Sequence, residues 1–275
     1  MKKLDGWLIG KFILLALLLF MFVFPLYWLV MTTLKPGVDV IEFPPRFVPS
    51  RLFFDNYPRA WTEYSTSFLY RNTAIASLVG IALGLLIGIP AAYSAARFRY
   101  KGRDDFMFFI LTTRFLPPIT AAVPLYIVFK SVGMLNNVFA LGILYAAMNL
   151  PIITWVLRAY FREIPIELEQ SYMLDGHSRW KAFFRIVFPL SWPGIAAVTM
   201  LSVCFSWGEF LFALLFTFNI HAKTLPVKVA EMQGDIGILW GEITVIGTIA
   251  LIPLMVFFVI IQRHLVRGLT FGALK

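Results

Sequence analysis

The chain contains apolar runs that are long enough to cross a lipid bilayer, and these runs limit the possible folds more than any other feature. The hydrocarbon core is about 30 Å thick, which a helix of about 20 apolar residues spans. Six such runs occur, at residues 12–34, 68–96, 105–129, 136–161, 189–215 and 242–262. Only 14% of the residues are charged, whereas soluble domains carry about 25%. The sequence therefore predicts an all-α integral membrane protein, a single domain over 1–275 with six transmembrane helices.

The distribution of basic residues predicts the orientation of these helices. Fifteen of the 24 Lys and Arg residues fall on one side of the six predicted helices and seven on the other, while Arg71 and Arg114 lie at or within a membrane boundary. Lipid-adjacent cations stay preferentially in the cytoplasm, so we expect both termini to be cytoplasmic. The net charge of +9 has the same origin, and we expect no nucleic-acid partner. The first apolar run follows Lys2, Lys3 and Lys11 but lacks a small-residue cleavage site, which predicts an uncleaved helix.

A polar interval at residues 163–194 separates the fourth and fifth apolar runs and has helical periodicity. Pro165 suits the first position of a helix, and Glu167 and Glu169 place negative charge in its first turn. Gly176 can adopt the left-handed conformation that ends a helix. We therefore predict a short cytoplasmic helix from Pro165 to Asp175.

The second half of this interval predicts a basic amphipathic helix at the membrane surface. Its aromatic or apolar positions and its cations alternate at helical spacing: Trp180, Phe183, Phe184 and Val187, with Arg179, Lys181 and Arg185. Periodicity alone leaves two interpretations open, a simple connection between two membrane helices and an element that docks on a partner.

Few ionisable residues lie within the predicted membrane helices, and each is costly there unless it has a function or a partner. Arg114 lies in the third run and Glu209 in the fifth. They form either a structural ion pair or two solute-facing groups. Asn149 and Trp207 add an amide and an indole, which suit a polyhydroxylated ligand. Prolines within the runs predict bent helices around a pathway: Pro90, Pro117, Pro118, Pro124 and Pro151.

Motifs for catalysis, metal binding and nucleotide binding are missing from the sequence. The three histidines, His177, His221 and His264, are widely separated, and Cys204 has no second cysteine with which to form a disulfide or a metal site. No Walker-type sequence is present, so any ATP that drives this protein must bind another polypeptide. We therefore predict that the chain is not an enzyme and holds neither a metal nor a cofactor.

The polar interval resembles the coupling loop of ABC importer permeases, the E-A-A-x-x-x-G loop that docks on the nucleotide-binding subunit. The similar segment is LEQSYMLDGHSRWKAFFRIVFPLSWPG, and the matching residues are Asp175, Gly176, Phe183, Ile186, Pro189 and Pro193. The chain departs from the family pattern at Gln170-Ser171-Tyr172, where Glu-Ala-Ala is most frequent, and at His177. The resemblance implies a coupling loop at about residues 162–188. It assigns coupling to the ATPase to Glu169, Gln170, Ser171, Tyr172, Leu174, Asp175 and Gly176. Of these we expect Ser171, Tyr172, Leu174 and Gly176 to form the contact itself.

Other blocks resemble the carbohydrate importers of the maltose type. They are PLYWLVMTTLKP, AAYSAARFRYKGRD, VPLYIVFKSVGMLNN and WVLRAYFREIPIELE, and the ending QRHLVRGLTFGALK is similar to the tail of the smaller, second permease of those systems. The resemblance implies a permease subunit in the bacterial cytoplasmic (inner) membrane that imports a sugar or sugar-like solute. Its implied partners are a second permease, an extracytoplasmic solute-binding protein, and an ATPase dimer that binds ATP and Mg.

Alternatives to a sugar importer also follow from the sequence. An ABC permease for a polyol phosphate, a polyamine or an amino acid fits the same loop. The positive charge of Arg114 also keeps an anionic solute among the alternatives. An ATP-independent channel or secondary transporter is a further alternative, although no internal repeat is found. We expect Arg114, Asn149, Trp207 and Glu209 to lie along the solute pathway.

Overall fold

The computed structural model describes residues 6–233 and 239–271, and all regular secondary structure in this part of the chain is helical. Four helices are long and apolar enough to span a bilayer: α1 (Gly6–Thr33), α4 (Thr66–Arg97), α7 (Val138–Glu163) and α14 (Trp240–Phe271). Two bent pairs of helices raise the number of candidate spans to six if each pair is one span. The prediction of an all-α membrane protein is thus confirmed. Lys2, Lys3 and the last four residues of the C-terminal block lie outside the described residues.

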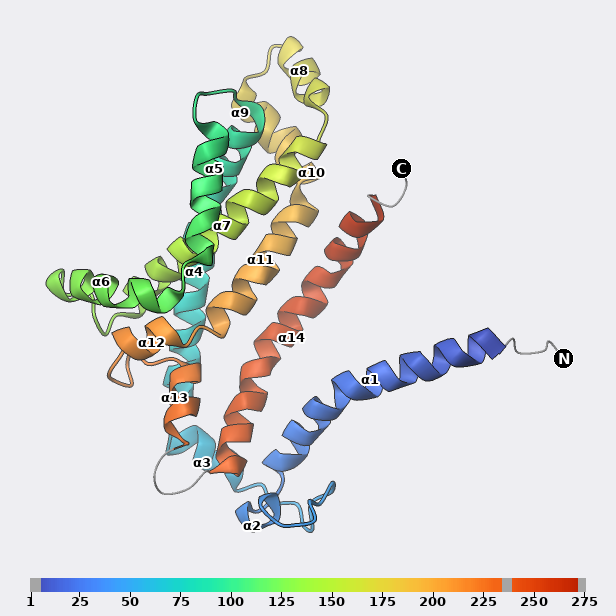
Figure 1. Cartoon of the computed structure of the whole chain (residues 1–275), viewed down its shortest axis with the longest axis vertical. Helices are drawn as coiled ribbons and strands as arrows, with labels where there is room; N and C mark the ends of the chain where they lie inside the picture. Colours follow the sequence, from blue (N-terminus) through green and yellow to red (C-terminus); the bar gives the residue numbers. More distant parts are fainter. Residues whose placement is uncertain (1–5, 234–238, 272–275) are drawn as a thin grey trace. The chain divides into compact units, whose positions relative to one another are not determined.

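The first bent pair breaks at the predicted proline pair. Helix α5 (Arg103–Thr112) and the 3-10 turn η1 (Thr113–Phe115) are followed by α6 (Pro118–Ser131) at an angle of 96°, and Figure 1 shows this change of direction. Two adjacent prolines remove two helical N–H donors and push the preceding residue into an extended conformation. The helices continue through Pro90, Pro124 and Pro151, which lie inside α4, α6 and α7.

The second bent pair begins within the predicted coupling loop. Residues 179–190 form one helical segment made of α9 (Arg179–Ala182), the π-helix η2 (Phe183–Val187) and α10 (Phe188–Leu190). Helix α11 (Trp192–Trp207) departs from this segment at 70°. The apolar run predicted at 189–215 is divided again after Trp207, and α12 (Leu211–Phe216) and α13 (Leu225–Glu231) follow.

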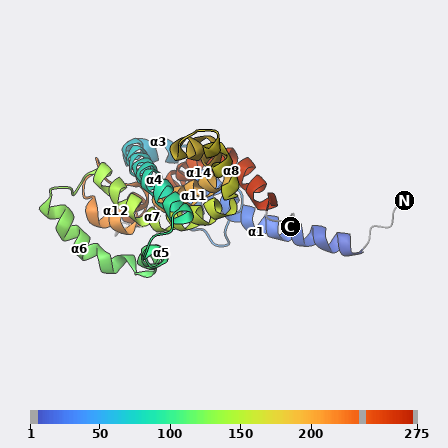
Figure 2. The ribbon, with the colours of Figure 1, turned by 90° about the horizontal axis from the view of Figure 1, so that it is seen from above.

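The described residues group into two compact units. The first combines Met1–Ser67 with Val229–Ile252, and the second combines Phe68–Lys228 with Pro253–Lys275. In the second unit α7 packs along α11, as Figures 1 and 2 show. Buried apolar side chains of α4, α7, η2 and α11 form a core there that includes Leu157, Phe161, Phe183 and Val198.

The first unit is held by buried polar contacts near the end of α1, around the short helices α2 (Gly37–Val40) and α3 (Asn56–Thr62). The Asn56 amide donates hydrogen bonds to the carbonyl oxygens of Thr33 and Lys35, both at 2.9 Å. Lys35 is fully buried and donates to the carbonyl of Arg46. Burial lowers the pKa of Lys35, and the Asp39 carboxylate opposes this shift. These buried polar groups form hydrogen bonds with one another. The largely irregular segment that follows α1 can therefore pack without leaving buried donors or acceptors unpaired.

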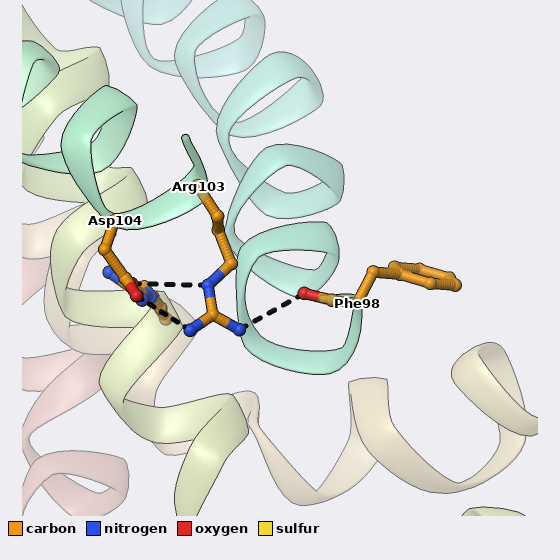
Figure 3. Close-up of polar contacts among 4 residues, drawn as sticks. Phe98, Arg103 and Asp104 are labelled. Atoms are coloured by element: carbon orange, nitrogen blue, oxygen red, sulfur yellow. Dashed lines mark hydrogen bonds and ion pairs between the residues drawn. The ribbon is translucent and has the colours of Figure 1, made fainter. Parts of the chain in front are cut away.

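The turn between α4 and α5 is closed by a basic side chain. Arg103 donates to the Asp104 carboxylate at 2.9 and 3.2 Å and to the carbonyl of Phe98 at 3.2 Å (Figure 3). Asp104 also forms an ion pair with Arg158 of α7. These contacts connect the ends of α4 and α5 to α7.

A row of glycines on α4 allows close packing against α7. A Cβ atom at Gly80 would lie 2.6 Å from the Tyr145 Cβ, and one at Gly88 would lie 2.5 Å from Ile153 Cγ2. Gly84 lies one turn from each of them, and a Cβ atom there would lie 2.9 Å from Ile153 Cδ1. Small residues spaced four apart let helix backbones approach closely within membranes. The α4–α7 contact therefore depends on the absence of side chains at these positions.

We predict that Gly80→Ala lowers the melting temperature of the purified protein in detergent, because overpacking costs about 1–3 kcal/mol. Gly10→Ala is the matched control, since no heavy atom lies within 4 Å of a Cβ atom there. The control should keep or slightly raise the melting temperature, because Ala favours a helix over Gly by about 1 kcal/mol. A Gly80→Ala protein as stable as the control would contradict close packing at this contact.

Candidate functional site

The helix predicted in the polar interval is present and ends as predicted. Helix α8 extends over Ile166–Leu174, with Pro165 at its N-cap and Asp175 at its C-cap. Pro165 therefore precedes the first helical position rather than occupying it. Gly176 has a φ of 85°, in the left-handed region that glycine adopts without steric cost. Figure 1 shows α8 next to α9, and the two are in contact.

Most of the residues expected to couple the chain to an ATPase lie on the surface of this hairpin. Gln170, Ser171, Leu174, Asp175 and Gly176 are exposed, and Tyr172 is half-buried. Leu174 is 87% exposed and is the large apolar side chain nearest to the Asp175-Gly176 turn. The surface of α8 thus presents an apolar contact at its C-terminal end.

Glu169 differs from the other six expected coupling residues because it is only 2% exposed. The Tyr93 hydroxyl donates a hydrogen bond to its Oε2 atom at 2.6 Å, and the Arg97 guanidinium forms an ion pair with its Oε1 atom. A second nitrogen of Arg97 donates to the carbonyl of Ile164 at 2.9 Å. Sequence reasoning missed Tyr93 and Arg97, because no spacing signal links residues of α4 to a glutamate far along the chain.

The segment 179–190 places its apolar side chains on two surfaces. Phe183 and Val187 are buried, whereas Trp180 and Phe184 are exposed. The exposed pair lines an apolar groove of about 700 Å³ between this segment and α4. Its walls are almost entirely hydrocarbon, so they offer few hydrogen bonds to a polyhydroxylated solute.

A smaller polar cavity unites three of the four residues expected along the solute pathway. Its volume is about 60 Å³. The lining residues are Arg114, Tyr145, Met148, Asn149, Phe205, Ser206 and Glu209. Trp207, the fourth expected residue, does not line this cavity, and its buried ring packs edge-on against Tyr70 at 5.6 Å. Tyr145 was not anticipated, because a tyrosine in an aromatic-rich chain carries no distinguishing signal.

Arg114 and Glu209 make separate contacts within the cavity. The guanidinium of Arg114 donates to the carbonyl of Met148 at 3.1 Å and lies 4.4 Å from the Phe205 ring centroid. The Glu209 carboxylate accepts hydrogen bonds from the N–H groups of Phe212 and Ala213 at 2.9 and 3.1 Å, and thereby caps the first turn of α12. In the described part of the chain, Arg114 and Glu209 do not form an ion pair with each other. The structural ion pair considered for them is thus not formed.

The Asn149 amide holds two helices together at the same cavity. It donates to the carbonyl of Tyr145 at 2.9 Å and to the Ser206 hydroxyl at 2.8 Å, which links α7 to α11. Most N–H donors of Arg114 remain available, because its described contacts use one of them. The cavity can therefore bind a hydroxyl or an anionic oxygen. Residues 6–233 and 239–271 contain no group of three or more His, Cys, Asp or Glu side chains that could hold a metal ion.

Comparisons with known proteins give close relatives over nearly the whole chain. The chain is 33% identical to the sulfoquinovosyl glycerol transport system permease protein SmoH of Agrobacterium fabrum, over 96% of this chain and 93% of that protein. It is also 33% identical to the trehalose/maltose transport system permease protein MalG of Thermococcus litoralis, over 92% and 91% of the two chains.

A solved structure has the same fold. It is a chain from a bacterial ABC transporter that imports the acidic polysaccharide alginate, with a TM-score of 0.77 and 20% identity over 96% of this chain and 98% of that chain. Residues 73–271 match the family described as binding-protein-dependent transport system inner membrane component. This match covers more than half of the sequence, and the chain belongs to that family of inner-membrane transport proteins.

Proposed function

We propose that the chain is the smaller, second permease of a maltose-type ABC importer, and that it imports a sugar or sugar-like solute. The observation that carries this proposal is the exposed surface of α8 from Gln170 to Gly176, on a hairpin that resembles the family's coupling loop. The names of the relatives, which include a trehalose/maltose permease and a sulfoquinovosyl glycerol permease, support the solute class. The partners are a second permease, an ATPase dimer and an extracytoplasmic solute-binding protein.

In the proposed topology each bent pair is one span, so that six spans form a single transmembrane domain over residues 1–275 with both termini in the cytoplasm. The excess of Lys and Arg on the side of α8 supports this orientation. It places the hairpin where cytoplasmic ATPase subunits can reach it. ATP and Mg bind those subunits, and this chain contributes the docking surface and the pathway.

The polar cavity forms one wall of the proposed solute pathway. A cavity of about 60 Å³ is too small for a sugar, since small-molecule sites measure about 300–1,000 Å³. The second permease completes the site in this proposal. Arg114 is the group best suited to contact the solute, because its hydrogen bond to protein uses only one of its N–H donors. Asn149 and Glu209 are engaged by protein atoms.

Reconstitution tests the proposed function directly. The chain, its partner permease, its ATPase and its binding protein are placed in proteoliposomes, and uptake of sugars is followed with ATP inside. A thermal-shift screen of the binding protein against sugars, polyol phosphates, polyamines and amino acids identifies the solute to use. Uptake that continues without the ATPase would contradict an ABC importer, and binding of amino acids or polyamines alone would contradict the sugar assignment.

We predict that Leu174→Arg releases the ATPase from the complex, because it places a charge on the exposed apolar residue of the proposed docking surface. Binding is measured by co-purification of the ATPase with the tagged permease. Truncation or disruption of a central contact residue costs about 2 kcal/mol or more, which corresponds to a loss of affinity of about 30-fold. Ile41→Arg is the control, since Ile41 is also an exposed apolar residue, at 74%, but lies outside the hairpin. Equal ATPase binding in the two variants would contradict docking at α8.

We predict that Arg114→Gln raises the KM for uptake by about tenfold or more, because a hydrogen bond to a charged group contributes about 1.5–3 kcal/mol. The effect is larger for an anionic sugar than for a neutral one, since Gln keeps donors but not the charge. Arg71→Gln serves as the control, because Arg71 lies on α4 over the Phe68 ring and outside the cavity. An unchanged KM in Arg114→Gln would remove this residue from the pathway.

A further inference from the structure

Glu169 is the point where the coupling helix α8 joins the spanning helices. The side chains of Arg97 and Glu169 are only 5% and 3% exposed. Among the described residues, Glu169 makes the only side-chain hydrogen bonds from α8 to a spanning helix, and both partners, Tyr93 and Arg97, lie on α4. We propose that these three residues, the Glu169 cluster, are positioning residues that make α4 follow the movements of α8. This inference rests on the proposed function, in which an ATPase moves α8.

A buried ion pair suits this task better than apolar packing alone. Two charges that leave water are stable only with good mutual geometry and with their remaining hydrogen bonds satisfied. Here Arg97 donates to Glu169 and to the carbonyl of Ile164, while Tyr93 donates to the second oxygen of Glu169. Apolar side chains can slide over one another with little change in contact area. The cluster instead has one favoured arrangement, so α8 cannot shift relative to α4 without leaving a buried charge unpaired.

The cluster also includes the end of α7 and the second half of the hairpin. Ile164, whose carbonyl accepts from Arg97, is the C-cap residue of α7. The Tyr93 ring contacts Phe161 of α7 and Phe183 of η2, with centroid distances of 5.8 and 4.7 Å. Tyr93 thus bonds to α8 through its hydroxyl and packs on η2 through its ring. Both halves of the hairpin are held by one residue of α4.

The exposed and buried sides of α8 therefore have different roles. Leu174 and its neighbours form the surface that meets a partner, whereas Glu169 faces the spanning helices. The resemblance placed Glu169 among the residues that couple the chain to the ATPase. Its burial makes it unavailable to a partner in this structure and assigns it to transmission within the chain.

The test uses the complete importer in proteoliposomes and measures solute molecules taken up per ATP hydrolysed. We expect Glu169→Gln to lower this ratio at least about fivefold, the lower end of typical coupling between sites, while ATPase co-purification stays at the wild-type level. Tyr93→Phe keeps the ring packing and removes only the hydroxyl, so it should lower both the ratio and the melting temperature by less than Glu169→Gln does. This second variant keeps the test valid if Glu169→Gln does not fold.

Arg158→Met is the matched structural control. Arg158 is buried and pairs with Asp104 between α7 and α5, without contact to α8. We expect it to lower the melting temperature and to leave the uptake ratio unchanged. An equal loss of ratio in Arg158→Met and Glu169→Gln would mean that any ion pair with a buried arginine has this effect and would overturn the proposal.

The Leu174→Arg variant separates failure of this inference from failure of the proposed function. If Leu174→Arg releases the ATPase while Glu169→Gln and Tyr93→Phe keep the wild-type ratio, α8 is the docking helix and the Glu169 cluster does not transmit. If Leu174→Arg leaves the ATPase bound, the proposed function of α8 is itself wrong. A reduced ratio in both cluster variants with full ATPase binding supports the proposal.

Discussion

The need to satisfy every backbone polar group within hydrocarbon determines where this chain can depart from helical structure. The chain bends sharply at Pro117 and Pro118 and breaks between Trp207 and Leu211. At the second break the Glu209 carboxylate accepts hydrogen bonds from the N–H groups of Phe212 and Ala213, in the first turn of α12. Arg114 lies just before the first break, and both charged residues line the same polar cavity. Irregular backbone at membrane depth is tolerated where it lies within protein or lines a cavity, and these two breaks fit that description.

Local sequence signals predicted the elements well, because they depend on neighbouring residues. The apolar runs marked the long helices, and Pro165 and Gly176 marked α8 within one residue at each end. The polar residues within the runs were also informative, since Arg114, Asn149 and Glu209 line one cavity. The burial cost of a polar group forces it toward other polar groups, so such residues tend to converge.

Contacts between distant segments could not be predicted in the same way. The pairing of Arg97 with Glu169 joins residues that no periodicity relates, and the π-helix at Phe183–Val187 has no recognised sequence signal. The ligand contact suggested by the Trp207 indole stays a prediction, and the packing of its ring against Tyr70 was likewise not foreseen. The glycine row was visible in the sequence as a four-residue spacing, and its meaning depended on knowing that α7 lies opposite.

The two departures from the coupling-loop pattern are connected in space. Tyr172 and His177 stand at positions where the family pattern most often has alanine, and their ring centroids are 4.2 Å apart. Each ring would leave a gap beside the other if one alone were changed to alanine, so the pair forms one aromatic unit next to Gly176. The proposed docking surface is therefore broader than an alanine-rich one at this end of α8. An ATPase that fits it needs a correspondingly wider groove, which makes exchange with ATPase subunits suited to an alanine-rich loop unfavourable on steric grounds.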